Sequence, residues 1–319
     1  MGPHLRYAVI LAGLALAAAP VQAQLSGHNL KGDFGLRSGT QPDPGFYVSP
    51  MFLSFDADTL RNRDGDSIGI DPERRAGLDA RAYALVLSYV TDFTLLGAHV
   101  GFMAAPSFTN NNLEIPVLDF ESRTDTGFAD LYVQPFVLGW HAPRADVTVG
   151  LGVFAPTGRY EPGASDNVGL GMWSYEVFAG TTLYLDEEKS WSLATTAFYE
   201  THGKKKDTDV RVGDILTLEG GLGKSFLDGA LSVGVAYYAQ WKLTDDDLGL
   251  RFELPGGPLL GKHRVYGFGP ELTVPVASKT KLFALVNGRF FWETGARTTV
   301  EGTTLLITAT VPIPSLAIN

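Results

Sequence analysis

A few residue patterns in this chain could support catalysis or cofactor binding, and each fails on spacing. Gly223-Lys224-Ser225 resembles the end of a phosphate-binding loop, but that loop needs a glycine at the position of Leu218. The chain has no G-x-S-x-G nucleophile elbow, and none of its six histidines has the i, i+4 partner of a zinc protease. With no cysteine, thiolate metal sites and disulfides are excluded. We therefore expect neither an enzyme nor a cofactor.

Clusters of like charge are the next candidates for a binding site. Asp64, Asp66 and Asp71, and separately Asp245-Asp246-Asp247, could bind Ca²⁺ through carboxylate oxygens, and Lys204-Lys205-Lys206 could meet lipid phosphates. Such charges are more often simply solvated, so whether the acidic clusters bind divalent cations stays open. The net charge of −10 argues against a nucleic-acid partner, because few cations are available to neutralise phosphates.

Polar residues inside apolar, alternating segments are more informative. Period-two alternation assigns ten residues to one inward face: His99, Asp130, Tyr132, Gln134, Glu176, Phe178, Glu219, Glu271, Asn287 and Arg289. They could line a lumen that offers polar contacts and aromatic walls to small amphipathic solutes. They could equally form a satisfied polar core, since buried charges are usually paired.

The elements that must position these residues are long strands. In 144–154, Val147, Val149 and Leu151 alternate with small or polar residues, and the same pattern recurs along the chain. Twelve such segments are expected: 45–56, 79–91, 94–105, 126–140, 144–156, 170–185, 189–201, 210–225, 229–242, 262–276, 280–294 and 299–312. Most are long enough for a tilted strand to cross a bilayer, which takes about 9–11 residues.

The connections between these segments alternate in length. Tight turns are expected at 91–93, 141–143, 186–188, 227–229 and 278–279, and longer polar loops at 57–78, 106–125, 157–169, 202–209 and 243–261; only the connection near 295–298 departs from this order. Short periplasmic turns and long extracellular loops are typical of outer-membrane barrels. We therefore predict an all-β, antiparallel transmembrane β-barrel of about 12 strands over residues 45–319. With that number of strands the lumen is either narrow or plugged.

Aromatic residues stand near the ends of the expected strands, as interface girdles require. They are Trp140, Trp173, Tyr184, Trp191, Tyr199, Trp241 and Trp292. A soluble β-sandwich with scattered aromatics is the alternative, but it would not require short and long connections to alternate.

The N-terminal region is not part of the strand pattern. Arg6, the apolar stretch 8–19 and Val21-Gln22-Ala23 are typical of a secretory signal peptide over residues 1–23. Segment 24–44 either is a periplasmic tail or folds into the lumen as a plug. In the second case His28, Asp33 and Arg37 would meet the inward charges.

Two prolines interrupt expected strands. Proline cannot donate to a strand ladder, and a closed barrel has no free edge to accommodate it. Pro135 and Pro270 should therefore mark a bulge or a local gap. A bulge at the rim is one reading. The other is a defect in the wall through which apolar solute leaves sideways into the membrane.

Several stretches, in order along the mature chain, resemble one family. They are 27–32 (GHNLKG), 42–47 (PDPGFY), 127–131 (GFADL), 155–160 (APTGRY), 199–201 (YET) and 213–214 (GD). This spacing is similar to that of the MetA-pathway-of-phenol-degradation (SphA-like) outer-membrane family. The resemblance implies an exported β-barrel with a role in the uptake of hydrophobic aromatic compounds. The chain departs from barrel norms at its C-terminus, which ends in Asn319 rather than an aromatic residue.

From the residues and the resemblance together we expect a monomeric barrel in the bacterial outer membrane. It would let small hydrophobic or aromatic compounds enter passively, with outer-membrane lipids as its surroundings and possible lateral exit through the wall. Two alternatives stay open: a barrel enzyme acting on lipids, and a closed structural or adhesive barrel.

Overall fold

The computed structural model describes residues 25–67, 77–115, 120–227, 230–249, 261–278 and 281–313. The expected signal peptide over 1–23 and Asp71 of the first acidic cluster lie outside these ranges.

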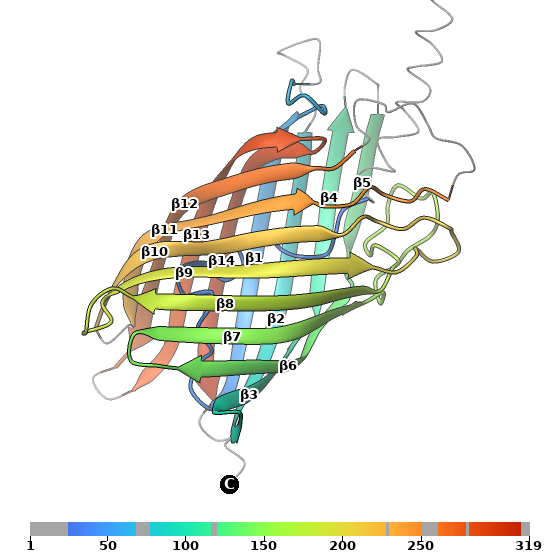
Figure 1. Ribbon diagram of the computed structural model, residues 1–319. Helices are drawn as coiled ribbons and strands as arrows, with labels where there is room; N and C mark the ends of the chain where they lie inside the picture. The colour runs from blue at the N-terminus through green and yellow to red at the C-terminus, as the bar shows by residue number, and fades with distance from the viewer. Residues whose placement is uncertain are drawn as a thin grey trace, which may run out of the picture.

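The described strands form one antiparallel sheet that closes on itself (Figure 1). Closure is made by β1 (Gly45–Leu60), which pairs with β2 (Gly77–Leu95) on one side and with β14 (Val300–Ile313) on the other. The remaining strands are β3 (Ala98–Ala105), β4 (Ser107–Ile115), β5 (Phe120–Phe128), β6 (Leu131–His141), β7 (Ala145–Ala155), β8 (Ser174–Tyr184), β9 (Trp191–His202), β10 (Ile215–Phe226), β11 (Leu231–Lys242), β12 (Arg264–Ala277) and β13 (Leu282–Arg297). Closure pairs the backbone groups of the barrel wall within the sheet, as the membrane interior requires because it offers no water to hydrate them.

The fourteen labelled segments make a wall of twelve strands, because two strands are each interrupted once. β3 and β4 both pair with β2 and are separated only by Pro106. β5 and β6 are separated by Ala129 and Asp130, and they pair with β4 and β3 respectively. The predicted fold class and strand number are therefore confirmed.

Two of the predicted connections are wrong. Residues 106–125 were expected to be a loop, but most of them form β4 and β5, a hairpin that extends the wall upward (Figure 1). Its polar residues resemble loop residues because much of the hairpin lies above the apolar belt of the barrel. The turn expected at 91–93 is also displaced: β2 continues to Leu95, and Leu96 and Gly97, both with positive φ, make the turn.

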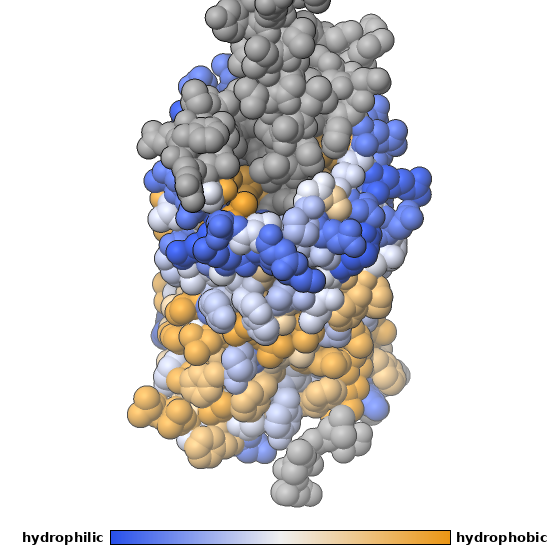
Figure 2. All heavy atoms as spheres, turned by 90° about the vertical axis from the view of Figure 1, so that its right-hand side faces the viewer, coloured by the Kyte–Doolittle hydropathy of each residue, from blue (hydrophilic) through white to orange (hydrophobic). Residues whose placement is uncertain are grey.

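The outer surface carries a belt of apolar side chains (Figure 2). On β7, β8 and β11, Val149, Val177 and Val235 are exposed, while their neighbours along each strand face the interior. Trp173, Trp191, Tyr199 and Trp292 are exposed as an aromatic girdle requires. Tyr184 is not part of the girdle: it is only 8% exposed, and its hydroxyl donates to Asp146 inside the barrel.

The first residue of β1 and the last residue of β14 lie at the same end of the molecule, the end that carries the short turns (Figure 1). This is the periplasmic end by the usual asymmetry of such barrels. The longer connections mark the opposite, extracellular end. The only described helix is the single 3₁₀ turn η1 (Gly35–Arg37), and no described helix is long and apolar enough to span a membrane.

Candidate functional site

Residues 25–44 run along the inside of the barrel, where buried glutamates accept their backbone N–H groups. The bonds are His28 N and Asn29 N to Glu200 (2.8 and 3.1 Å), Asp33 N and Phe34 N to Glu219 (2.9 and 3.2 Å), and Leu36 N to Glu271 (2.9 Å). A segment without sheet or helix must satisfy its backbone donors in another way. Here the inward carboxylates of β9, β10 and β12 satisfy them.

Cations balance part of this negative charge. Arg289 Nη1 donates to the carbonyl oxygens of Gly32 (3.0 Å) and Asp33, and its Nε lies 3.3 Å from Glu271. Lys31 Nζ donates to the buried Glu293 at 2.6 Å. The segment therefore brings both backbone donors and a charge to the lumen wall.

At the extracellular end His28 fixes the segment to the gap between β5 and β6. Its Nε2 lies 2.9 Å from Asp130 and its Nδ1 2.8 Å from the Ser174 hydroxyl, while its ring stacks on Phe154. Asp130 also accepts the backbone N–H groups of Gly158 (2.9 Å) and Leu170 (2.7 Å). One carboxylate therefore joins the interrupted strand, the segment and the loop 156–173.

Glycines on the wall make room for side chains of the segment. A Cβ at Gly221, Gly223 or Gly234 would lie 2.7–2.8 Å from a methyl carbon of Leu36, closer than atoms can approach. Gly101 and Gly139 make a similar socket for Gln41 near the periplasmic end. The segment therefore fits this wall in shape as well as in charge, from Leu25 at one end to Gln41 at the other.

Most residues predicted to line the lumen contact this segment or each other. Asp130, Glu176, Glu219, Glu271 and Arg289 bond to it directly, Glu176 through the Asn29 side chain. Tyr132 donates to Glu176, Gln134 to Tyr132, and Asn287 to Glu271, while Phe178 packs with Phe198 beside Phe34. His99 lies apart, near the periplasmic turn, with its Nδ1 3.1 Å from the Thr91 carbonyl oxygen.

The three residues predicted for a plug also lie in the segment and bond to the wall in different ways. His28 binds through its ring, Asp33 through its backbone and Arg37 through its guanidinium, which donates to Ser225 at 3.1 Å.

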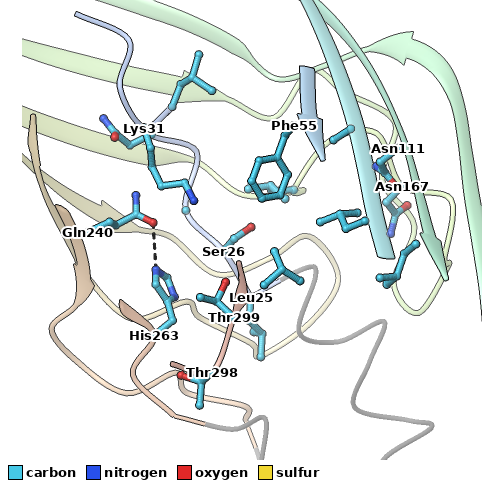
Figure 3. A pocket seen from close by; sticks show the side chains of 18 of the residues that line it. Leu25, Ser26, Lys31, Phe55, Asn111, Asn167, Gln240, His263, Thr298 and Thr299 are labelled. Carbon is cyan, nitrogen blue, oxygen red and sulfur yellow. Dashed lines mark hydrogen bonds between the residues drawn. The ribbon is translucent and has the colours of Figure 1, made fainter. Parts of the chain in front are cut away.

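A cavity of about 410 Å³ lies at the extracellular end, on the side of the lumen that the segment leaves open (Figure 3). We call it the vestibule. Its apolar lining includes Leu53, Phe55, Leu78, Leu113 and Val168; its polar lining includes Lys31, Asn111, Asn167, Gln240 and His263. None of the ten predicted lumen residues lines it. Its wall comes from β1, β2, β4, β5 and β14 and the loop 156–173 on one side, and from the segment, the end of β11 and residues 261–263 on the other.

The vestibule offers hydrogen-bonding groups that carry little charge. Burial and the nearby Lys242 lower the pKa of His263 to about 3, so this ring is neutral, with Nε2 3.2 Å from Gln240. The buried hydroxyls of Thr124 and Thr298 have no hydrogen-bond partner among the described residues. The described residues include no group of three or more acidic or histidine side chains that could bind a metal ion.

The sequence interpretation missed the vestibule residues for two reasons. Asn111 and Leu113 fall in the stretch expected to be a loop, and Leu53 and Phe55 resemble ordinary inward strand residues. Period-two alternation gives the inward face of a strand but cannot say which inward faces the segment covers.

The two prolines behave differently. The register between β6 and β7 shifts between Val133 and Phe136, so a bulge lies at Pro135. At Pro270 the register of β12 is the same on both sides, against β11 and against β13. Both prolines are exposed on the outer surface.

The chain matches the family described as "Putative MetA-pathway of phenol degradation" over residues 57–309. Among solved structures it is similar to the COG4313 outer membrane channel from Pseudomonas putida F1, at 12% identity and a TM-score of 0.72, covering 90% of this chain and 100% of that one. The CymD monoaromatic hydrocarbon channel (10% identity, TM-score 0.43, 86% and 90% covered) and a Pseudomonas aeruginosa FadL homologue (8%, 0.44, 90% and 99%) are more distant. No curated protein matches.

We predict that loosening the segment raises ion conductance. In Gly35→Ala the new methyl group would overlap Glu271 and Arg289 at a residue with φ +60°, and the deletion of residues 25–40 removes most of the segment. Both changes should increase single-channel current in planar bilayers severalfold, the deletion more than the substitution.

The matched control is Gly163→Ala. Gly163 also has a positive φ (+79°), but no atom lies within 4 Å of the added Cβ, so the backbone strain is similar without the collision. Unchanged current in both the substitution and the deletion would show that the segment does not obstruct the lumen.

Proposed function

The chain belongs to this family of bacterial outer-membrane barrels, and on that premise we propose that it is a channel for the passive entry of small hydrophobic or aromatic compounds. No nucleotide-binding motif accompanies the barrel in the sequence, so transport would be diffusion biased by binding.

The observation that carries the proposal is the vestibule. Its volume falls within the range of about 300–1,000 Å³ that is typical of small-molecule sites. Leucines and Phe55 supply an apolar surface, and neutral amide, imidazole and hydroxyl groups could orient a bound solute through hydrogen bonds. Such a lining suits a solute with an apolar ring and a small polar substituent, and its charged residues are already paired: Lys31 with Glu293, and Lys242 with Asp246.

The position of the segment supports a path below the vestibule. The hydrogen bonds described between residues 28–40 and the wall all end on β7–β13 or on Asp130. The faces of β1, β2 and β14 are not tied to the segment in this way. A solute would therefore move along these three strands towards the periplasm. The segment would stay bound to the opposite wall and would not have to leave the lumen.

Lateral exit is the finer part of the proposal. The bulge at Pro135 interrupts the regular pairing of β6 with β7 and lies on an exposed face of the wall, which supports it as the place where an apolar solute would leave. At Pro270 the register does not shift, and although Gly269 and Pro270 have no partner on β13, the pairing with β11 is unbroken, so the support is weaker there.

Selective uptake tests the channel. Proteoliposomes should take up small aromatic compounds faster than protein-free vesicles of the same lipid, and faster than sugars of similar size. Ala80→Trp, which fills the vestibule from β2, should slow aromatic uptake severalfold. Val235→Trp, on the lipid-facing side of β11, should leave it unchanged.

Equal entry of aromatics and sugars would indicate a general pore instead. No entry of either would favour a closed structural barrel or a lipid-acting enzyme.

Restoring the ladder tests lateral exit. Pro135→Val supplies the missing backbone donor, so uptake of apolar solutes should fall while ion conductance stays the same. Pro270→Val is the matched control and should change neither. If Pro135→Val leaves apolar uptake unchanged, solutes do not leave through this bulge.

A further inference from the structure

A second cleft, of about 550 Å³, opens between two extracellular loops, 156–173 and 203–214. It is lined by Arg159, Lys204 and Lys206, with Tyr160 and Trp173 among its other walls. We call it the basic cleft. In Figure 2 hydrophilic residues form a band above the apolar belt.

The basic cleft has a charge opposite to that of the whole chain. The chain has 25 basic and 35 acidic residues, yet three basic residues and only one acidic residue, Glu161, line this cleft. Local positive charge on an acidic protein attracts anionic groups against the overall field.

The basic side chains are available to a ligand. Arg159 Nη1 lies 2.7 Å from Asp166, and Lys204 Nζ lies 2.8 Å from Asp209, but both pairs are largely exposed. Exposed ion pairs contribute little to stability, so they can exchange one partner for another. Lys206 has no ion pair within the described part of the chain. Arg159 Nη2 also donates to the Asp166 backbone carbonyl oxygen at 2.7 Å. A phosphate would therefore have to replace Asp166 on the guanidinium, whose planar fork matches two phosphate oxygens.

The loop between β9 and β10 is held so that two of its three consecutive lysines point outward. Lys205 turns inward, where its Nζ donates to the Leu170 carbonyl oxygen at 2.6 Å and lies 5.3 Å from the centre of the Tyr160 ring. Burial lowers the pKa of Lys205 to about 8. The Lys206 backbone N–H donates to the Gly171 carbonyl oxygen at 2.7 Å. The two loops are thus pinned together and the cleft is preformed.

The height of the basic cleft indicates where its ligand comes from. Trp173 lines it and is 49% exposed; Tyr175, 51% exposed, follows on the outward face of β8, and Val177 continues into the apolar belt. Exposed tryptophan and tyrosine at the end of an apolar face mark the level of lipid headgroups. The cleft therefore opens at the headgroup level of the outer leaflet.

We propose that the basic cleft binds the phosphate of a phosphorylated glycolipid of the outer leaflet, with Arg159, Lys204 and Lys206 as its contacts. The acyl chains of this lipid would lie along the outward face of β8, below Trp173. The site is separate from the vestibule and does not depend on the transported solute.

Lipid binding to the full-length barrel in detergent tests this proposal, with bound lipid counted by native mass spectrometry. The probes are lipid A, dephosphorylated lipid A and inorganic phosphate. Lipid A should bind, and the dephosphorylated form should bind at least about tenfold more weakly, since each basic residue near an anionic surface is worth roughly fivefold in affinity. The triple variant R159Q/K204Q/K206Q should lose lipid A binding by a similar factor.

The matched control is K189Q/K224Q/K281Q, which removes the same charge near the periplasmic end. It should bind lipid A within about twofold of the unchanged protein, because charges a Debye length of about 10 Å or more away are screened. Unchanged heat-modified migration on gels would confirm that each variant folds. An equal loss in the control, or no loss in the cleft variant, would overturn the proposal. Competition by inorganic phosphate at the same concentration as lipid A would also overturn it, because the site would then recognise a free anion.

Discussion

The structure depends on the pairing of buried carboxylates with a segment that belongs to no sheet. Glu200, Glu219 and Glu271 point into a barrel interior where an unpaired carboxylate would be costly. The N-terminal segment supplies their donors from its backbone, and hydrogen bonds to charged groups contribute about 1.5–3 kcal/mol each. Wall and segment therefore satisfy one another: without the segment the wall has unpaired charge, and without the wall the segment has unpaired N–H groups.

This pairing is one-sided, and the asymmetry determines what the lumen can do. The carboxylates stand on β8–β10, β12 and β13, so the segment is held against that half of the wall. The faces of β1, β2, β4, β5 and β14 stay free at the extracellular end, and there the vestibule opens. Polar residues inside the barrel thus support the segment, whereas the apolar residues opposite them supply the surface that a solute would meet.

The sequence predicted the barrel well because period two and the alternation of short and long connections are local signals. It also singled out the inward carboxylates and His28, Asp33 and Arg37, which the structure places close together; their role as lumen lining or plug stays a prediction. It failed where a partner distant in sequence decides the outcome. Tyr184 was predicted to be a girdle residue, but its hydroxyl donates a hydrogen bond to Asp146 inside the barrel. The hairpin of β4 and β5 was predicted to be a loop because its residues are polar. The glycines at 221, 223 and 234 were the available signal for the segment's path, since three small inward residues on neighbouring strands leave room for Leu36.

The direction in which the segment runs has a consequence for how the molecule is assembled. It enters beside Met172 and Val212 at the extracellular end and reaches the periplasmic end just before Gly45, where β1 begins. The joint between β1 and β14 connects the two ends of the barrel chain, the pairing with the greatest loop-closure cost, so it should form last. Since the segment is covalently continuous with β1, the pairing of β1 with β14 that closes the barrel also encloses the segment. The lumen is therefore occupied from the moment the barrel closes.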